Sequence, residues 1–157
     1  MGDERTILFL CPHNAAKSVI AAAYCARLAA ARGVTLRATS AGTDPDPGVS
    51  PGMAAALLAE GIDVRAHCPR RVTAEALARA SRVVSLGCHL GDIAPPGLAV
   101  ESWDDVPSPS TDLTRACAVI AAHVRQLVDT EASKRGQSPR LGTVINPTGS
   151  GGKGAPS

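Results

Sequence analysis

Residues 6–18, TILFLCPHNAAKS, constrain this chain most, together with the alanine-rich segment 19–32 that follows them. The apolar run before Cys11 is typical of a buried strand, and the alanine-rich segment has high helix propensity. In a strand–loop–helix turn, the free N–H groups of the loop and of the helix start converge on one point and form an anion site. Positive potential there favours a thiolate, so Cys11 is a candidate nucleophile and Lys17 adds a full charge. The alternative is that Cys11 is only a small buried hydrophobic residue.

Length and charge exclude several classes of function. A chain of 157 residues is one domain's worth, and a net charge of +2 with 2% aromatic residues does not favour nucleic acid as a partner. The first residues, MGDER, carry acids and do not resemble a signal peptide, and no apolar run is long enough to span a membrane. We therefore expect a cytoplasmic protein. Five cysteines, an odd number at irregular spacing, are expected to be thiols and not a disulfide framework.

Turn residues divide the rest of the chain into alternating strands and helices. Gly33 supplies a helix stop after residue 32, Ser50 and Thr73 are placed to cap helices, and Gly136 follows the last helix. This alternation predicts a parallel α/β sheet that binds ligands at the carboxyl ends of its strands. We expect one domain over residues 1–136 and a disordered tail over 137–157. The expected strands are 6–10, 34–40, 82–86 and 98–103, and the expected helices are 17–32, 50–60, 73–80 and 112–135.

The loop and several later blocks resemble the low-molecular-weight protein tyrosine phosphatases and the arsenate reductases built on the same fold. Their signature is Cys-x5-Arg-Ser after the first strand, with Asn three residues past the Cys, and Cys11, Asn14 and Ser18 match it. The likeness covers roughly residues 6–130 and implies a single three-layer domain, with a four-stranded parallel sheet of order 2-1-3-4 and helices on both faces. Its later blocks are SAGT (40–43), LAEGID (58–63), HCPR (67–70), LARA (77–80) and VPSP (106–109).

The resemblance also implies roles for the loop residues. Cys11 is the nucleophile, Ser18 hydrogen-bonds its thiolate, and Asn14 and Ser40 hold the loop in shape. The oxyanion is bound by the loop as a whole, which comprises Cys11, Pro12, His13, Asn14, Ala15, Ala16, Lys17 and Ser18.

Two functional positions depart from the family pattern. Lys17 stands where the family has arginine, so a point charge replaces a fork that grips two oxygens. Ser108 stands where the family has its general acid, and a neutral hydroxyl cannot usefully protonate a leaving oxygen. Asp105, just upstream, is the candidate replacement acid. Only Trp103 is expected near the rim to stack on a phosphotyrosine ring, which argues against that substrate.

The other thiols suggest a redox step. In the 2-1-3-4 order, Cys88 at the end of the third strand lies at the same sheet edge as Cys11 and could resolve it as a disulfide. The third cysteine of a thioredoxin relay has no counterpart near Ala94. Cys25 and Cys117 lie among apolar helix residues and are expected to be core. A zinc site, formed by Cys11, His13, Cys88 and His89, is a further alternative, but no Cys-x2-Cys spacing supports it.

These patterns favour an arsenate reductase-like protein in which Cys11 attacks a small oxyanion, arsenate or phosphate. Such a protein needs no cofactor beyond an external thiol or a thiol-redox partner as reductant. The main alternative is a catalytically silent oxyanion-binding or thiol-redox regulatory domain, and a slow tyrosine phosphatase is the third. Whether the chain is an enzyme therefore depends on whether catalysis remains possible with Lys17 in place of the arginine and Ser108 in place of the general acid.

Overall fold

The computed structural model describes residues 5–134, whose four strands form one parallel sheet of order β2-β1-β3-β4. This confirms the fold class and the strand order expected from the sequence. The strands are β1 (Arg5–Cys11), β2 (Leu36–Gly42), β3 (Arg82–Ser85) and β4 (Val100–Ser102). The helices are α1 (Lys17–Arg32), α2 (Pro51–Ala59), α3 (Ala74–Arg79), the short 3-10 helix η1 (Gly91–Ile93) and α4 (Leu113–Lys134).

The chain divides into two compact units, residues 1–124 and 125–157, and the boundary falls within α4. The first unit contains the whole sheet, all the other helices and the start of α4. In the second unit, the Nζ of Lys134 pairs with Oε2 of Glu131 at 3.2 Å, one turn apart on the helix. The tail expected over 137–157 lies outside the described residues. Among residues 5–134, no helix is long and apolar enough to cross a membrane.

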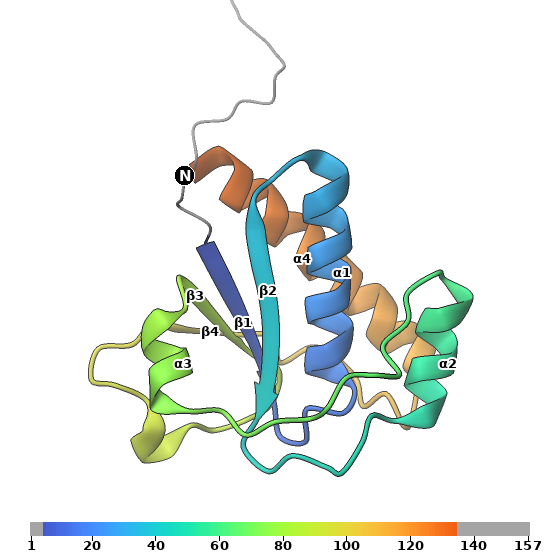
Figure 1. The fold of residues 1–157 in the computed structure, drawn as a ribbon, viewed down its shortest axis with the longest axis horizontal. Coiled ribbons are helices and arrows are strands. Elements are labelled where there is room, and N and C mark those ends of the chain that lie inside the picture. Colours follow the sequence, from blue (N-terminus) through green and yellow to red (C-terminus); the bar gives the residue numbers. More distant parts are fainter. Residues whose placement is uncertain (1–4, 135–157) are drawn as a thin grey trace, which may run out of the picture. The chain divides into compact units, whose positions relative to one another are not determined.

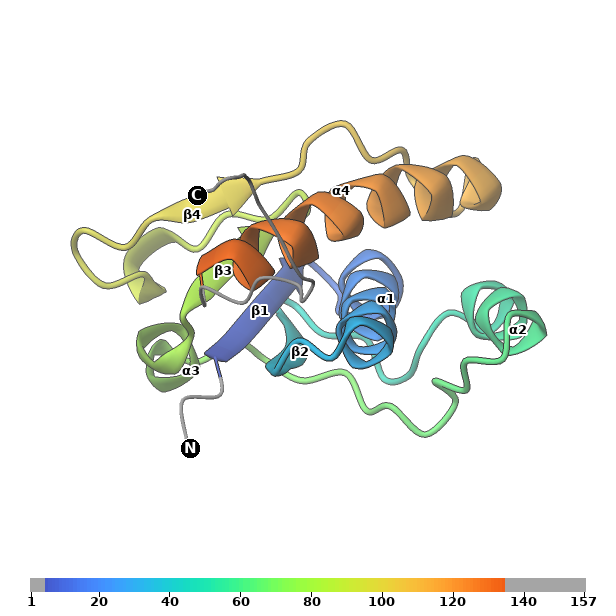
Figure 2. The same ribbon diagram turned by 90° about the horizontal axis from the view of Figure 1, so that it is seen from above.

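Helices cover both faces of the sheet (Figures 1 and 2). α1 lies against β1 and β2 on one face, and the short α3 lies against β1 on the other. The α3 face has its own apolar cluster, built from alternate residues of the strands because successive side chains of a strand point to opposite faces. Its buried members are Leu8, Leu10, Ala41, Val72, Leu77 and Val83.

The capping residues expected from the sequence act at the helix ends. Ser50 Oγ accepts from the N–H of Met53 at the start of α2, and Thr73 Oγ1 accepts from that of Ala76 at the start of α3. Gly33 ends α1 in the left-handed region, at φ 69°. α1 differs at its other end: Ala16 is its N-cap and provides no side-chain cap, so the first N–H groups of α1 stay available.

β2 begins and ends two residues later than the sequence predicts. Val34 still belongs to the end of α1, because its N–H donates to the carbonyl of Ala29 at 2.9 Å. At the other end, pairing with β1 extends the strand until Gly42 lies opposite Cys11. β3 and β4 are shorter than expected, Arg82–Ser85 and Val100–Ser102. The shift of β2 matters because it brings Gly42 beneath the loop that follows β1.

Gly42 is the point where β2 supports this loop. A Cβ on Gly42 would lie 2.6 Å from the carbonyl oxygen of Pro12 and 2.9 Å from the backbone nitrogen of Asn14. Both are backbone atoms and cannot rotate away. Only glycine allows this close approach.

We expect Gly42→Ala to lower the free energy of unfolding by about 1–3 kcal/mol, the usual cost of an added methyl group in a packed site. Equilibrium urea denaturation measures the change. Gly52→Ala is the matched control, because nothing lies within 4 Å of the Cβ position at Gly52. Equal free energies of unfolding for the two variants would show that the loop does not rest on Gly42.

Candidate active site

The loop between β1 and α1 has its carbonyl groups bonded on its outer side. Backbone N–H groups of the segment 44–50 donate to the carbonyls of Pro12 (2.7 Å, from Asp44), His13 (3.0 Å) and Ala15 (2.9 Å). Among residues 5–134, no acceptor is bonded to the backbone N–H groups of residues 13–16. The loop therefore offers these N–H groups, together with the uncapped start of α1, to an anion.

Cys11 lies at the base of this loop as the last residue of β1. Its side chain is buried, and its Sγ lies 2.9 Å from Oγ of Ser18 and 3.4 Å from the backbone nitrogen of the same residue. Asn14 Nδ2 donates to Oγ of Ser18 at 2.8 Å, which leaves the Ser18 hydroxyl proton for the sulfur. Two donors therefore converge on Sγ, an arrangement that stabilises a thiolate.

Asn14 is the residue that fixes the loop. It is fully buried, and its backbone has a φ of 50°, in the left-handed region that Asn tolerates better than most residues. Besides its bond to Ser18, its Oδ1 accepts from Nε2 of His67 (3.1 Å) and from the backbone nitrogen of Arg70 (3.0 Å). Asn14 thus joins the loop between β1 and α1 to the segment before α3.

The partners of Asn14 were not all expected. Sequence analysis assigned the support of the loop to Asn14 and Ser40. Ser40 is buried in β2 opposite Phe9, but its hydroxyl makes no hydrogen bond among the described residues, so its support of the loop stays a prediction. The hydrogen bonds come from His67 and Arg70 instead. The sequence block HCPR (67–70) contains both residues, but its spacing alone does not show that they contact Asn14.

Burial and the charge of Arg70 both lower the pKa of His67. A neutral imidazole with its proton on Nε2 is the form that donates to Asn14 Oδ1, so the environment favours the form that the hydrogen bond needs.

Lys17, the first residue of α1, extends towards the loop after β3. A Cβ on Gly87 would lie 3.6 Å from Nζ of Lys17, and Gly87 has a φ of 89°. The ammonium group is therefore close to the end of β3, and it makes no ion pair among residues 5–134. It adds a positive charge beside the N–H groups of the loop.

Cys88 lies at the same edge of the sheet. Its Sγ is 3.4 Å from Oγ of Ser85, which also accepts from the Cys88 N–H at 3.2 Å. Burial raises the pKa of the Cys88 thiol, the hydrogen bond from Ser85 lowers it, and the charge of Cys11 raises it further. The two sulfurs are thus close enough to interact electrostatically, and Cys88 is held as a neutral thiol.

Comparison with known proteins now identifies the family. The sequence profile described as low molecular weight phosphotyrosine protein phosphatase matches residues 6–97. The chain belongs to this family. A search of curated protein sequences gave no match.

Solved structures of family members have the same fold. A thioredoxin-dependent arsenate reductase of Corynebacterium glutamicum is 24% identical, with a TM-score of 0.71 over 85% of this chain. This chain spans only 64% of that protein. An arsenate reductase of Archaeoglobus fulgidus is 26% identical, with a TM-score of 0.65 over 78% of this chain and 98% of the other. A low molecular weight phosphotyrosine phosphatase of Vibrio cholerae is 18% identical, with a TM-score of 0.73 over 83% and 98%.

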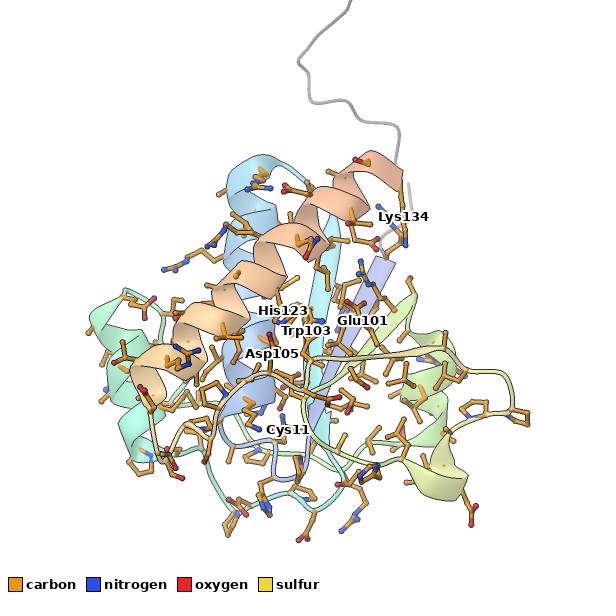
Figure 3. The ribbon with its side chains drawn as sticks, turned by 180° about the vertical axis from the view of Figure 1, so that it is seen from behind. Cys11, Glu101, Trp103, Asp105, His123 and Lys134 are labelled. Carbon is orange, nitrogen blue, oxygen red and sulfur yellow. The ribbon has the colours of Figure 1, made fainter. Side chains whose placement is uncertain are left out.

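The position of the family's general acid is occupied by the neutral side chain of Ser108. Ser108 Oγ lies 2.9 Å from Oγ of Ser110. Asp105 is bound to α4, with its Oδ1 2.8 Å from Nε2 of His123 (Figure 3). This hydrogen bond lowers the pKa of Asp105, which disfavours the protonated form that a general acid needs. Asp105 as the replacement acid stays a prediction, and this pKa shift does not favour it.

Trp103 does not line the rim either. It is 3% exposed, stacks on His123 with ring centroids 4.6 Å apart, and donates from Nε1 to Glu101 (3.0 Å). His13, a candidate zinc ligand, lies instead with Nδ1 3.4 Å from Oδ1 of Asp46. Residues 5–134 contain no group of three or more His, Cys, Asp or Glu that could hold a metal ion. The geometry thus places the buried Cys11 sulfur in a cradle, residues 11–18, that has no aromatic wall and whose N–H groups at 13–16 have no acceptor among the described residues.

The lowered pKa of His67 predicts how stability depends on pH. Because the unfolded chain takes up the proton first, the free energy of unfolding falls as the pH drops below about 6.5, and it stops falling below the pKa of the folded state. We expect His67→Gln, which can still donate to Asn14, to lose this contribution of at most about 1.4 kcal/mol per pH unit. Urea denaturation across this pH range measures it. His89→Gln, at an exposed histidine, should keep the wild-type slope, and an unchanged slope in His67→Gln would contradict the assignment.

Proposed function

We propose that this protein is an arsenate reductase-like enzyme in which the Cys11 thiolate attacks arsenate held by residues 12–18. The observation that carries the proposal is the intact cradle, in which the hydroxyl and the backbone N–H of Ser18 both face the buried sulfur and Asn14 Nδ2 donates to the Ser18 hydroxyl oxygen. Membership of a family that handles oxyanions through a cysteine supports it. The two arsenate reductases of similar fold support the choice of arsenate.

The chemistry divides into two steps. In the first, an S–As bond forms as an As–OH bond breaks, and the leaving hydroxide takes a proton and departs as water. In the second, a thiolate attacks Cys11 Sγ, the S–As electron pair moves onto arsenic, arsenite leaves, and Cys11 is left in a disulfide. Arsenate is thereby reduced by two electrons, and two thiols are oxidised.

The lack of a general acid and of an aromatic wall matters less for arsenate than for a phosphate ester. Hydrolysis of an aryl phosphate needs an acid that protonates the leaving oxygen, whereas Ser108 is neutral and the hydrogen bond to His123 lowers the pKa of Asp105. A phosphotyrosine ring also needs an aromatic wall, and Trp103 is buried. Arsenate needs no wall, and its own hydroxyl groups carry the protons for the departing water.

The thiol of the second step has two candidate sources. Cys88 lies at the same edge of the sheet as Cys11, although burial raises its pKa and so reduces its thiolate fraction. An external small thiol or a thiol-redox protein is the other source, and the similarity to a thioredoxin-dependent reductase supports a redox partner. Substitution of Cys88 separates the two.

We expect arsenate and phosphate to protect Cys11 from alkylation by iodoacetamide, as located by mass spectrometry, and arsenite to form when a thiol donor is added. Cys11→Ser should abolish arsenite formation. Cys88→Ser should abolish it only if Cys88 resolves the adduct, and Cys68→Ser, at an exposed thiol, should leave it unchanged. A Cys11 that neither anion protects would contradict the proposal.

The same departures also favour a second candidate, a catalytically silent domain that binds an oxyanion or senses thiol redox state. It rests on Lys17, which lacks the planar fork of arginine, together with the neutral Ser108 at the position of the general acid. In this case anions protect Cys11 but no arsenite forms with any thiol donor.

Both proposed functions imply weak phosphatase activity, and both attribute this weakness to Lys17 and Ser108. We expect Lys17→Arg with Ser108→Asp to raise turnover of p-nitrophenyl phosphate by about a hundredfold or more, because each restores a transition-state interaction. Lys134→Arg with Ser81→Asp makes the same exchanges away from the site, at an exposed serine before β3, and should change turnover less than about twofold. If the two double variants behave alike, other residues limit the reaction.

A further inference from the structure

The outer edge of β2 is open along most of its length. Gly42 donates its N–H to the carbonyl of Arg70 and accepts from the N–H of Val72, so the backbone groups of Gly42 point away from β1. Backbone groups alternate in direction along a strand, and those of Leu36, Ala38 and Ser40 therefore point outwards too. Among the described residues, none of these three makes a hydrogen bond on that side.

A neighbouring strand begins at this edge but does not continue along it. The only bridge there among residues 5–134 joins Gly42 to Arg71. Pro69 has no N–H to donate, and the segment before it crosses to the α1 side of β2 (Figure 1). Residues 36–41 of β2 thus remain an exposed template for a further strand.

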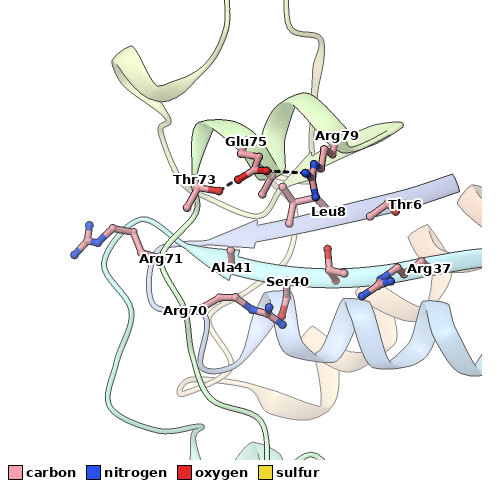
Figure 4. A pocket seen from close by; sticks show the side chains of 12 residues that line it. Thr6, Leu8, Arg37, Ser40, Ala41, Arg70, Arg71, Thr73, Glu75 and Arg79 are labelled. Carbon is pink, nitrogen blue, oxygen red and sulfur yellow. Dashed lines mark hydrogen bonds and ion pairs between the residues drawn. The ribbon is translucent and has the colours of Figure 1, made fainter.

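Each face of this edge has a hollow beside it. On the α3 side, a hollow of about 430 Å³ is lined by Arg37, Arg70 and Arg71 among others (Figure 4). It exists because α3 is only six residues long and lies over β1, leaving β2 uncovered. On the other face, a second hollow has a floor of small α1 residues, Ala22, Ala23 and Ala26. Arg37 and Arg70 border both hollows.

The charge of this edge is positive and only partly compensated. Arg79 pairs with Glu75 at 2.7 Å, and Arg71 donates to the carbonyl of Thr43. The side chains of Arg37 and Arg70 make no ion pair or hydrogen bond among residues 5–134. Arg37 lies five residues before Gly42, whose N–H donates to the carbonyl of Arg70, so roughly 16 Å of strand separates the backbone of Arg37 from this contact at about 3.3 Å per residue.

We propose that the outer edge of β2 binds an extended acidic peptide of a partner protein as an added strand. The backbone of residues 36–41 supplies the hydrogen bonds of strand addition. Alternate acidic side chains enter the hollow on the α3 side and meet Arg37 and Arg70, and the side chains between them rest on the alanines of α1.

The positive charge of the edge favours an acidic peptide over the two occupants that the chain itself could provide, a second copy and residues 135–157. A second copy would bring the same arginines against this edge. Residues 135–157 contain Arg135, Arg140 and Lys153 and no Asp or Glu, so they do not complement it.

Fluorescence anisotropy with a labelled eight-residue peptide of alternating Glu and Val tests the proposal on the full chain. We expect saturable binding that weakens in high salt and is not displaced by phosphate, because the cradle at Cys11 is a separate site. Arg37→Glu with Arg70→Glu should weaken binding about tenfold or more, and Arg37→Glu alone should act in the same direction without touching the backbone contact of Arg70. Arg115→Glu, at an exposed arginine on α4, is the matched control and should change affinity less than about twofold.

Two peptides with N-methyl groups on alternate backbone amides test strand addition directly. In an added strand only one set of amides faces β2, so one methylated peptide should lose binding and the other should keep it. Equal binding of both peptides would leave simple charge attraction and overturn strand addition. The proposal is also overturned if the acidic peptide does not bind, if phosphate displaces it, if Arg115→Glu is equally damaging, or if sedimentation shows that the edge pairs two copies of the chain.

Discussion

The buried amide of Asn14 is the interaction on which the site depends. Its Nδ2 orients the Ser18 hydroxyl towards Cys11, and its Oδ1 accepts from His67 and from the backbone of Arg70. The backbone N–H groups of residues 13–16 have no acceptors among the described residues. The hydrogen bonds of Asn14 are therefore needed to hold the loop in this conformation. The lowered pKa of His67 favours the neutral imidazole, so the hydrogen bond to Asn14 does not depend on protonation of His67 at physiological pH.

Anion binding and leaving-group chemistry are separate parts of this fold, and the chain departs from the family pattern in both, at Lys17 in the first and at Ser108 in the second. The cradle is built from β1, α1 and the segment 44–50, and all of its bonds are present. The general acid belongs to the loop after β4, where Ser108 is neutral and Asp105 is held by His123. A protein with the first part and without the second can still bind and attack an oxyanion that needs no protonated ester oxygen to leave.

The segment 67–72 connects the site to the edge of the sheet. His67 and the backbone of Arg70 hold Asn14, while Arg71 pairs with Gly42, on which the loop rests. The side chain of Arg70 faces the open edge of β2. The same few residues therefore shape the cradle on one side and the cationic edge on the other.

Much of the fold was predictable because its determinants are local. Apolar runs and alanine-rich segments predicted the strands and helices, and Ser50, Thr73 and Gly33 marked helix ends through contacts within a few residues. The family blocks supplied the strand order, which the structure confirms. The ends of β2 were wrong by two residues, because pairing with β1 and the αL turn after α1 set them and neither is visible in a propensity.

For the site, the sequence by itself determined the thiol, the lysine and the missing acid, since these are identities of residues at fixed spacing from Cys11. Only the tertiary structure decided their partners. It paired Asp105 with His123, buried Trp103 and assigned His67 and Arg70 to Asn14. The physical reason is separation along the chain: these two partners lie 53 and 56 positions after Asn14, and no local rule brings such distant groups together.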